Sequence, residues 1–370
     1  MSQPDNPKFT KRMRLCVVGN LLGRNPGYVT SQGQILADLL SKEGHEVISC
    51  SSKINRVRRL IDIVFTVILR RKNFDVLILE VYSGLNILMS ETVSFLGKIL
   101  GLRMIFVLHG GNLPDFSRRY PRWTKRVLAR ADVLVAPSPY LIKGLKNLEL
   151  PIRMVRNIVE IDKYPCKIRS KIAPKLVWMR SFHSLYNPQM AIKVLASVRN
   201  SHPDASLVMA GLDKGLEPEI KAMATEMGLA DAVRFPGFLD HDAKIEEFSR
   251  GDIYINTNHI DNMPVAVIEA CASGLPVIAT AVGGLPDLIE NGTNGILVPD
   301  SDLDAMVDAV HSLLKDSEIT EKLSTNGRKL AELSSWDFLR ICWDELFNEI
   351  METKPQKQAL NSRTFLTSTK

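Results

Sequence analysis

Short apolar runs alternate along the chain with longer segments in which apolar residues recur every three or four positions. Short runs bounded by polar residues or glycine predict buried strands. In the first part of the chain these runs are 13–20, 45–50, 75–79, 103–108 and 132–136. The segments between them, such as the amphipathic 29–43, predict helices. Strands that alternate with helices indicate a parallel sheet covered on both faces, so we expect an α/β, Rossmann-like first domain over residues 1–160.

The same alternation begins again after a segment rich in proline and charge, residues 151–174. A helix is predicted at 187–201, and strands are predicted at 175–179, 206–210, 233–235, 253–256 and 275–280. This pattern predicts a second doubly wound domain over residues 161–334. A last amphipathic helix is predicted within 335–353. The tail, 354–370, lacks apolar periodicity, and we expect it to be disordered.

Composition and charge narrow the class of protein. The 370 residues are 45% hydrophobic and 24% charged, as in globular proteins. Residues 1–160 hold 25 Lys and Arg against 12 Asp and Glu, whereas the remainder holds 22 against 29, so the first half is suited to an anionic surface. Five scattered cysteines and seven histidines show no metal-ligand spacing, which favours a reducing compartment and no metal site. Without a signal-like or membrane-spanning run, we expect a cytoplasmic protein.

The strongest chemical signal is the run 261–280, in which two acids bracket seven residues. Asp261 precedes a predicted helix N-terminus, where backbone N–H groups and the helix dipole favour an anion. Glu269 interrupts an apolar helix, and a carboxylate there is costly to bury without a partner such as the hydroxyls of a ligand. For an isolated pair of acids, the alternative interpretation is a helix cap and a solvated side chain.

The order of these features resembles the acid-x7-acid motif of the retaining GT-B glycosyltransferases, the "group 1" family often called family 4. The resemblance implies two Rossmann-like domains that face a central cleft, with the final helix crossing back to the first domain. It implies that Asp261 and the following Asn262 and Met263 hold the sugar of a nucleotide-sugar donor, and that Glu269 holds the ribose. Asp261 stands where many relatives have Glu, which shortens its reach.

The resemblance also implies donor contacts elsewhere in the second domain. Arg180 matches the arginine that neutralises the donor diphosphate, but no lysine follows it within residues 181–192, where relatives have one. His183, Tyr186 or Asn187 would take part of that role. Gly237 would bracket the nucleobase, and Gly283 and Gly284 would direct N–H groups at a phosphate. The alternatives are a surface arginine and ordinary turns.

In the first domain the resemblance points to two loops. His109 would face the donor sugar across the cleft, with Gly110 and Gly111 leaving room for a substrate. The alternative for His109 is a structural histidine. Gly19, Gly23 and Arg24 occupy the place of the family's first glycine loop, which shapes the acceptor side.

Two further patterns leave alternatives open. Basic residues flank the apolar run 60–69, which is either an interfacial helix over anionic headgroups or a core helix with basic ends. The triplets 240–242 and 302–304 each spell DxD, the metal–diphosphate motif of another glycosyltransferase fold. Both stand at predicted helix starts, so we interpret them as caps.

Together these features predict a retaining glycosyltransferase that needs neither a metal nor another cofactor. It would move a sugar from a nucleoside-diphosphate sugar to a polysaccharide or lipid-linked acceptor at the inner face of a membrane, without binding nucleic acid. The alternatives are a UDP-sugar 2-epimerase-like enzyme and a non-catalytic nucleotide-sugar-binding or membrane-associated protein. The missing lysine favours the non-catalytic alternative, whereas Asp261, Glu269, Arg180 and His109 oppose it.

Overall fold

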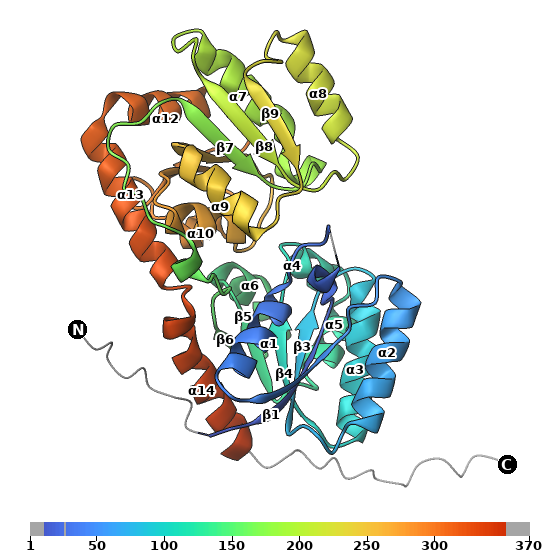
Figure 1. Cartoon of the computed structure of the whole chain (residues 1–370). Helices are drawn as coiled ribbons and strands as arrows, with labels where there is room; N and C mark the ends of the chain where they lie inside the picture. Colours follow the sequence, from blue (N-terminus) through green and yellow to red (C-terminus); the bar gives the residue numbers. More distant parts are fainter. Residues whose placement is uncertain (1–10, 26, 353–370) are drawn as a thin grey trace, which may run out of the picture.

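The computed structural model describes residues 11–25 and 27–352, which form two α/β domains (Figure 1). Each domain contains a sheet of six parallel strands with helices packed on it, so the predicted fold class is confirmed. The predicted tail, 354–370, and most of the polar N-terminal segment lie outside the described residues.

In the first domain the strand order is β2-β1-β3-β4-β5-β6. The strands are β1 (Arg14–Val18), β2 (Glu46–Cys50), β3 (Val76–Val81), β4 (Arg103–Leu108), β5 (Val133–Ala136) and β6 (Ile152–Met154). The helices are α1 (Gln32–Lys42), α2 (Arg56–Leu69), α3 (Asn86–Ile99), α4 (Leu113–Arg119), α5 (Pro121–Leu128) and α6 (Pro139–Gly144). Because β2 and β3 lie on opposite sides of β1, the loops that follow β1 and β3 diverge and open a crevice, which is where open α/β sheets bind ligands.

In the second domain the strand order is β12-β11-β10-β7-β8-β9. The strands are β7 (Lys175–Met179), β8 (Ser206–Ala210), β9 (Val233–Gly237), β10 (Ile253–Asn256), β11 (Val277–Thr280) and β12 (Ile296–Val298). The helices are α7 (Pro188–Arg199), α8 (Glu217–Glu226), α9 (His241–Arg250), α10 (Val265–Ala272), α11 (Leu285–Leu288), α12 (Leu303–Lys315) and α13 (Ser317–Glu332). Here the order reverses between β7 and β10, and the crevice opens between the loops after these two strands.

The predicted strands are confirmed, but two edge strands were not predicted. Strand β6 pairs only with β5 and β12 only with β11, and each is three residues long. Two of the three residues of β6 are exposed, so no apolar run marks it in the sequence. The helix α11 begins at Leu285, directly after Gly283 and Gly284, with Pro286 in its first turn.

The helix α14 (Trp336–Glu352) crosses back to the first domain, as the resemblance implied (Figure 1). Its buried side chains, among them Trp343 and Phe347, pack into the same core as Leu15 of β1 and Leu36 of α1. Trp336 Nε1 also donates a hydrogen bond of 2.9 Å to Glu43 at the end of α1. The helix α14 therefore fastens the second domain to the first.

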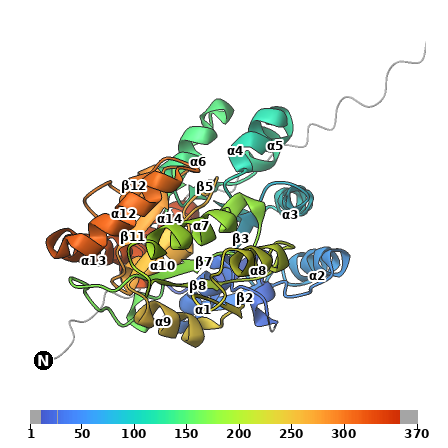
Figure 2. The same ribbon diagram turned by 90° about the horizontal axis from the view of Figure 1, so that it is seen from above.

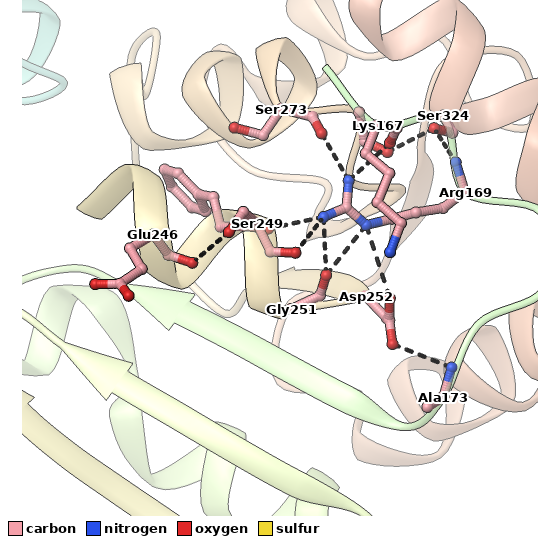
Figure 3. A network of polar contacts seen from close by, with 11 residues as sticks. Lys167, Arg169, Ala173, Glu246, Ser249, Gly251, Asp252, Ser273 and Ser324 are labelled. Atoms are coloured by element: carbon pink, nitrogen blue, oxygen red, sulfur yellow. Dashed lines mark hydrogen bonds and ion pairs between the residues drawn. The ribbon is translucent and has the colours of Figure 1, made fainter. Parts of the chain in front are cut away.

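The segment between the domains is anchored by Arg169, which is 2% exposed (Figure 3). Its guanidinium donates to the carbonyl oxygens of Gly251 and Ser273 and lies 3.8 Å from Asp252. These carbonyls follow α9 and α10, where the negative ends of the helix dipoles favour a cation. Burial lowers the pKa of Arg169, and the many acceptors around it offset the cost of burying its charge.

Candidate functional site

A cleft of about 1100 Å³ lies between the two domains. The first domain contributes Gly23 and Arg24 and the beginning of α1, and the second contributes Arg180, Gly211 and Glu269. Pockets for small ligands usually have volumes of about 300–1000 Å³, so this cleft is large enough for a nucleotide linked to a sugar. Four of the residues predicted from the sequence therefore line one cavity.

Arg180 and Asp261 form an ion pair at the crevice of the second sheet. Arg180 follows β7 and Asp261 lies beyond β10, the strand beside β7, so the reversal in strand order brings the two loops together. Asn258 Nδ2 donates a 2.6 Å hydrogen bond to the same carboxylate, and the guanidinium carbon lies 4.3 Å from the centre of the Tyr186 ring. Burial alone would lower the pKa of Arg180, but the Asp261 carboxylate together with Tyr186, Tyr254 and Glu269 outweighs burial, and the pKa is raised.

The backbone around Asp261 is held from two sides. The amide of Asn262 donates to Asp261 Oδ1 at 2.8 Å, and the amide of Gly284 donates to the Asp261 carbonyl at 2.9 Å. A Cβ at Gly283 would lie 1.9 Å from that carbonyl oxygen, so only glycine allows this approach. Gly283 and Gly284 thus support the Asp261 loop, and their contact with a phosphate stays a prediction.

The residues after Asp261 lie where the domains meet. Asn262 is bonded through its side-chain oxygen to the Ser138 hydroxyl, which also caps α6, and the Met263 carbonyl accepts a 2.9 Å bond from Asn157 Nδ2. Gly111 of the loop after β4 lies against the backbone of Asp261, since a Cβ at Gly111 would be 3.4 Å from the Asp261 carbonyl carbon. Asn262 and Met263 are buried in this contact, and their role toward a donor sugar stays a prediction.

Glu269 of α10 is 8% exposed and has two protein partners. Lys244 of α9 forms an ion pair with Glu269 Oε1, and the Tyr164 hydroxyl donates to the same oxygen at 2.7 Å. Burial and the Glu269 charge raise the pKa of Tyr164 well above its ordinary value, so the phenol stays protonated and able to donate. Because both contacts use Oε1, the second oxygen, Oε2, is left for a ligand in the cleft that Glu269 lines.

His109 does not line the large cleft. It directly follows β4, is 6% exposed, and borders a separate cavity of about 20 Å³ together with Glu80. His109 Nε2 lies 3.5 Å from Glu80 Oε1, and the imidazole stacks on Tyr82 with 4.9 Å between ring centres. Burial lowers the pKa of His109 to about 4 and raises the pKa of Glu80 to about 7. Gln32 and Ile158 border both cavities, so this pair lies next to the cleft.

The remaining predicted glycines have backbone roles in this structure. Gly237 has φ of +75°, and its carbonyl accepts a 2.9 Å bond from Gly211 N, which places the following Phe238 on the cleft wall. Gly110 has φ of +87° in the turn after His109. Gly19 does not line the cleft but lies against Glu80, since a Cβ there would come within 2.2 Å of the carboxylate.

Three members of the site were not found from the sequence. Lys244 and Tyr164 lie far along the chain from Glu269, and no local pattern connects them to it. Glu80 has a local signal, since it is a carboxylate in the apolar run 76–81, where every residue is buried. One acid at the end of a strand is usually solvated, however, so this signal alone does not identify a buried group.

The remaining motif interpretations concern metals and membranes. Asp240 accepts from Ala243 N and Asp302 from Ala305 N, both at 2.9 Å, so the interpretation of both DxD triplets as helix caps is confirmed. Across residues 11–25 and 27–352, no group of three or more His, Cys, Asp or Glu side chains is arranged to hold a metal ion. In the same part of the chain, no helix combines the length and apolarity needed to cross a bilayer.

Comparison with known proteins places the second domain in a family. Residues 169–330 match the family described as "Glycosyl transferases group 1". The chain is 30% identical over 139 residues to the alpha-D-kanosaminyltransferase of Streptomyces kanamyceticus, which covers 38% of this chain and 36% of the relative. It is 24% identical over 227 residues to the lipopolysaccharide core biosynthesis mannosyltransferase LpsB of Rhizobium meliloti, covering 57% and 63%. The chain thus spans less than two thirds of these curated relatives.

Solved structures share the fold of the whole chain. Sucrose-phosphate synthase from Thermosynechococcus elongatus superposes with a TM-score of 0.76 at 17% identity, over 92% of this chain and 99% of that protein. The Anabaena protein HepE, solved in complex with UDP-glucose, gives a TM-score of 0.69 at 17% identity over the same shares. At this identity the likeness establishes the two-domain GT-B fold.

Proposed function

We propose that this chain, whose residues 169–330 match the group 1 glycosyl transferases, transfers a sugar from a nucleoside-diphosphate sugar to an acceptor hydroxyl, with retention of the anomeric configuration. The observation that carries the proposal is the Arg180–Asp261 pair at the crevice of the second sheet, with Glu269 lining the same cleft. Relatives named as kanosaminyl- and mannosyltransferases, and a structural neighbour that holds UDP-glucose, support it.

In this function each side chain has a separate part. Glu269 Oε2 would accept the ribose hydroxyls, while Lys244 and Tyr164 hold Oε1. The Arg180 guanidinium would exchange part of its pairing with Asp261 for the diphosphate, whose oxygens it matches as a planar fork. Asp261 would then be free to accept hydrogen bonds from the sugar.

The chemical step needs charge stabilisation more than proton transfer from the protein. The acceptor oxygen bonds to the anomeric carbon on the face from which the diphosphate departs, and the acceptor proton leaves with the released diphosphate. Negative charge grows on that leaving group as the bond breaks, and a preorganised cation there contributes most in the transition state. Closing the cleft would exclude water, so that the acceptor reacts in its place.

The proposal includes no metal and no further cofactor. The test is direct: turnover measured with and without a chelator should be the same. A loss of turnover on chelation, restored by a divalent cation, would contradict this part of the proposal and leave the transfer reaction itself intact.

The acceptor is proposed to be a lipid-linked or polysaccharide precursor at an anionic membrane. The helices α2 and α3 lie next to each other at one side of the first domain (Figure 2). Each buries one face, which includes Ile63 and Val67 in α2, and leaves other apolar side chains exposed. The exposed side chains, each 43–75% accessible, are Ile54, Val57, Ile61, Phe65, Ile68, Leu69, Leu85, Leu88, Phe95 and Ile99. We call this set of side chains the two-helix face. Isolated apolar side chains are common at protein surfaces, but apolar side chains gathered on two neighbouring helices are better explained as a binding surface.

Charge around the two-helix face favours an anionic lipid surface as its partner. Exposed basic residues stand at both ends of α2, namely Arg56, Arg58, Arg70, Arg71 and Lys72. An amphipathic helix with an apolar face and basic ends binds in the headgroup region of anionic bilayers. The open alternative of an ordinary core helix does not account for the exposed face.

Vesicle binding tests this docking. The wild-type chain should sediment with vesicles that contain phosphatidylglycerol, and less so as salt rises, because exposed charges are screened over about 10 Å at 0.1 M ionic strength. Phe65→Glu should weaken binding by about tenfold or more, since it removes a buried aromatic ring from the bilayer. Phe338→Glu is the matched control, since Phe338 is 49% exposed on α14, away from the two-helix face. Equal binding to neutral vesicles, or none to either, would contradict the docking proposal.

One binding experiment tests the donor site. Calorimetry with UDP, GDP, ADP and TDP should identify one preferred nucleoside diphosphate. Arg180→Ala should weaken the binding of that diphosphate more than the binding of the matching nucleoside. Incubation with the corresponding nucleotide sugars then separates the alternatives, since transfer or slow hydrolysis supports a transferase and an epimerised donor supports an epimerase. Tight binding without any conversion across a range of acceptors would favour the non-catalytic alternative. The family match does not favour the epimerase.

A further inference from the structure

Glu80 occupies a cradle that is built for a carboxylate. It lies at the end of β3, is 1% exposed, and accepts a 2.6 Å hydrogen bond from Gly33 N in the first turn of α1. Glycine surrounds it on two sides, because a Cβ at Gly19 or at Gly33 would lie within 2.5 Å of its side chain. Ser31, the cap of α1, approaches the second carboxylate oxygen at 3.4 Å. This arrangement fixes the carboxylate in position at the crevice of the first sheet.

The group that faces Glu80 from the neighbouring strand is His109. Strands β3 and β4 are paired with Val81 opposite Leu108. The side chains of Glu80 and His109 therefore border the same small cavity. Nε2 of His109 is buried without a hydrogen-bond partner and lies 3.5 Å from Glu80 Oε1. Hydrogen bonds at active sites are commonly long until a ligand is bound.

The protonation states of this pair follow from its burial. The imidazole is neutral, because burial lowers the pKa of His109 to about 4. Burial raises the pKa of Glu80 to about 7, although the Gly33 amide, Ser31 and Tyr82 donate to it and favour its charged form. Arg156 and Trp343 border the same small cavity from the linker and from α14, and neither changes protonation between pH 5.5 and 8.5.

We propose that Glu80 is a positioning residue for His109: its carboxylate accepts the Nε2–H of the neutral imidazole and so selects the tautomer whose Nδ1 is a hydrogen-bond acceptor. When Glu80 carries a proton, the carboxylic acid donates to Nε2 instead, and Nδ1 becomes the protonated nitrogen. The loop after His109 contacts the Asp261 backbone through Gly111, so the choice of tautomer is made at the domain contact. Its importance for sugar transfer rests on the function proposed above.

Nitrogen NMR of labelled histidine tests the tautomer without requiring any activity. The His109 signals are assigned by their disappearance in His109→Gln. Between pH 5.5 and 8.5 the wild-type Nδ1 shift should move from the protonated toward the acceptor position as Glu80 loses its proton. In Glu80→Gln the same shift should stay constant over this range, because the amide does not titrate.

A matched variant separates positioning from packing. Tyr82→Phe keeps the ring that stacks on His109 and leaves Glu80 in place but removes a hydroxyl that donates to it. The tautomer change should therefore persist with its midpoint at higher pH. A wild-type signal that does not move with pH, or a Glu80→Gln signal that moves as the wild type does, would overturn the proposal.

Kinetics provide the second readout once the donor is known. For the wild type, kcat/KM should change around pH 7, and this limb of the profile should be lost in Glu80→Gln while KM for the donor changes little. If no variant shows turnover, the transferase function fails, and the NMR result still decides whether Glu80 sets the tautomer.

Discussion

The two domains share one architecture and use its crevice differently. In the second domain the loops after β7 and β10 place Arg180, which lines a cleft of about 1100 Å³, beside Asp261. In the first domain the loop after β1 and the end of β3 place Gly19 against Glu80, a single carboxylate that is 1% exposed. The same topological position therefore holds a ligand-facing ion pair in one domain and a buried, internally satisfied acid in the other.

Side-chain size and access to solvent account for the difference. Arg180 and Asp261 are paired with each other, and Arg180 also lines the large cleft, so that its guanidinium stays accessible to a ligand. Gly19 and Gly33 have no side chains, so α1 and the loop after β1 close over Glu80. Charge is retained where it can meet a ligand, whereas at the closed crevice burial raises the pKa of the acid to about 7.

The outer surfaces of the domains differ as well. The first domain exposes apolar side chains along the two neighbouring helices α2 and α3, whereas in the second domain large exposed apolar side chains such as Met227, which follows α8, and Ile319 of α13 lie on separate elements. Isolated apolar side chains are ordinary at protein surfaces, and a contiguous face indicates a partner. This difference supports the proposed donor site in the second domain and the proposed membrane docking of the first.

The largest effect is expected at the open crevice, from Arg180→Lys. Lysine keeps the charge but lacks the planar fork that matches two phosphate oxygens, and no lysine in residues 181–192 compensates. Turnover should fall by about 10²–10³-fold, as when one transition-state donor is lost, with a smaller change in donor affinity. Steady-state kinetics with the identified donor measure this. Turnover close to that of the wild type would show that another group carries the leaving-group charge.

At the closed crevice, Glu80 should make the free energy of unfolding decrease as pH rises. The folded pKa of Glu80, about 7, exceeds its ordinary value of 4.5, so the protonated acid favours the folded state at low pH, and this contribution is lost as pH rises through about 7. Relative to Glu80→Gln, the wild type should lose about 3 kcal/mol between pH 4.5 and 8.5. Denaturant unfolding of both proteins at the two pH values measures it, and a constant difference would contradict the burial argument.

A smaller effect is expected for Glu269→Gln, which keeps the shape of the proposed ribose acceptor but removes its charge. Affinity for the preferred nucleoside diphosphate should fall by about 1–3 kcal/mol, because hydrogen bonds to an ionised acceptor are the stronger ones. Calorimetry gives the dissociation constant, and circular dichroism serves as the control for folding. An unchanged dissociation constant would remove Glu269 from the donor site.

The smallest effect is expected for Tyr164→Phe, which deletes one of the two groups that hold Glu269 Oε1. The ion pair with Lys244 remains, so nucleotide affinity, measured by the same calorimetry, should fall by only about 0.5–1.5 kcal/mol, the usual net contribution of one hydrogen bond. If the loss matched that of Glu269→Gln, Tyr164 would have to contact the nucleotide itself.

The sequence by itself determined the parts of this protein that depend on local burial. Alternating apolar runs and amphipathic segments predicted two α/β domains, because strands and helices bury their side chains with different periods. The helix caps at Asp240 and Asp302 and the final helix could also be predicted, since each depends on residues that are neighbours in sequence. The acid motif pointed to the family that the second domain matches, because its spacing is set along one loop and one helix.

Only the tertiary structure decided which side chains meet. Tyr164 and Glu269 are 105 residues apart, and the bonds of Gly33 and Ser31 to Glu80 span 47 and 49 residues. Such contacts depend on strand order and on how closely backbones approach, which no local pattern encodes. The sequence likewise did not decide whether α2 is exposed. A helix with two apolar faces has the pattern of a core helix, and only the tertiary structure shows that no other element covers one of these faces.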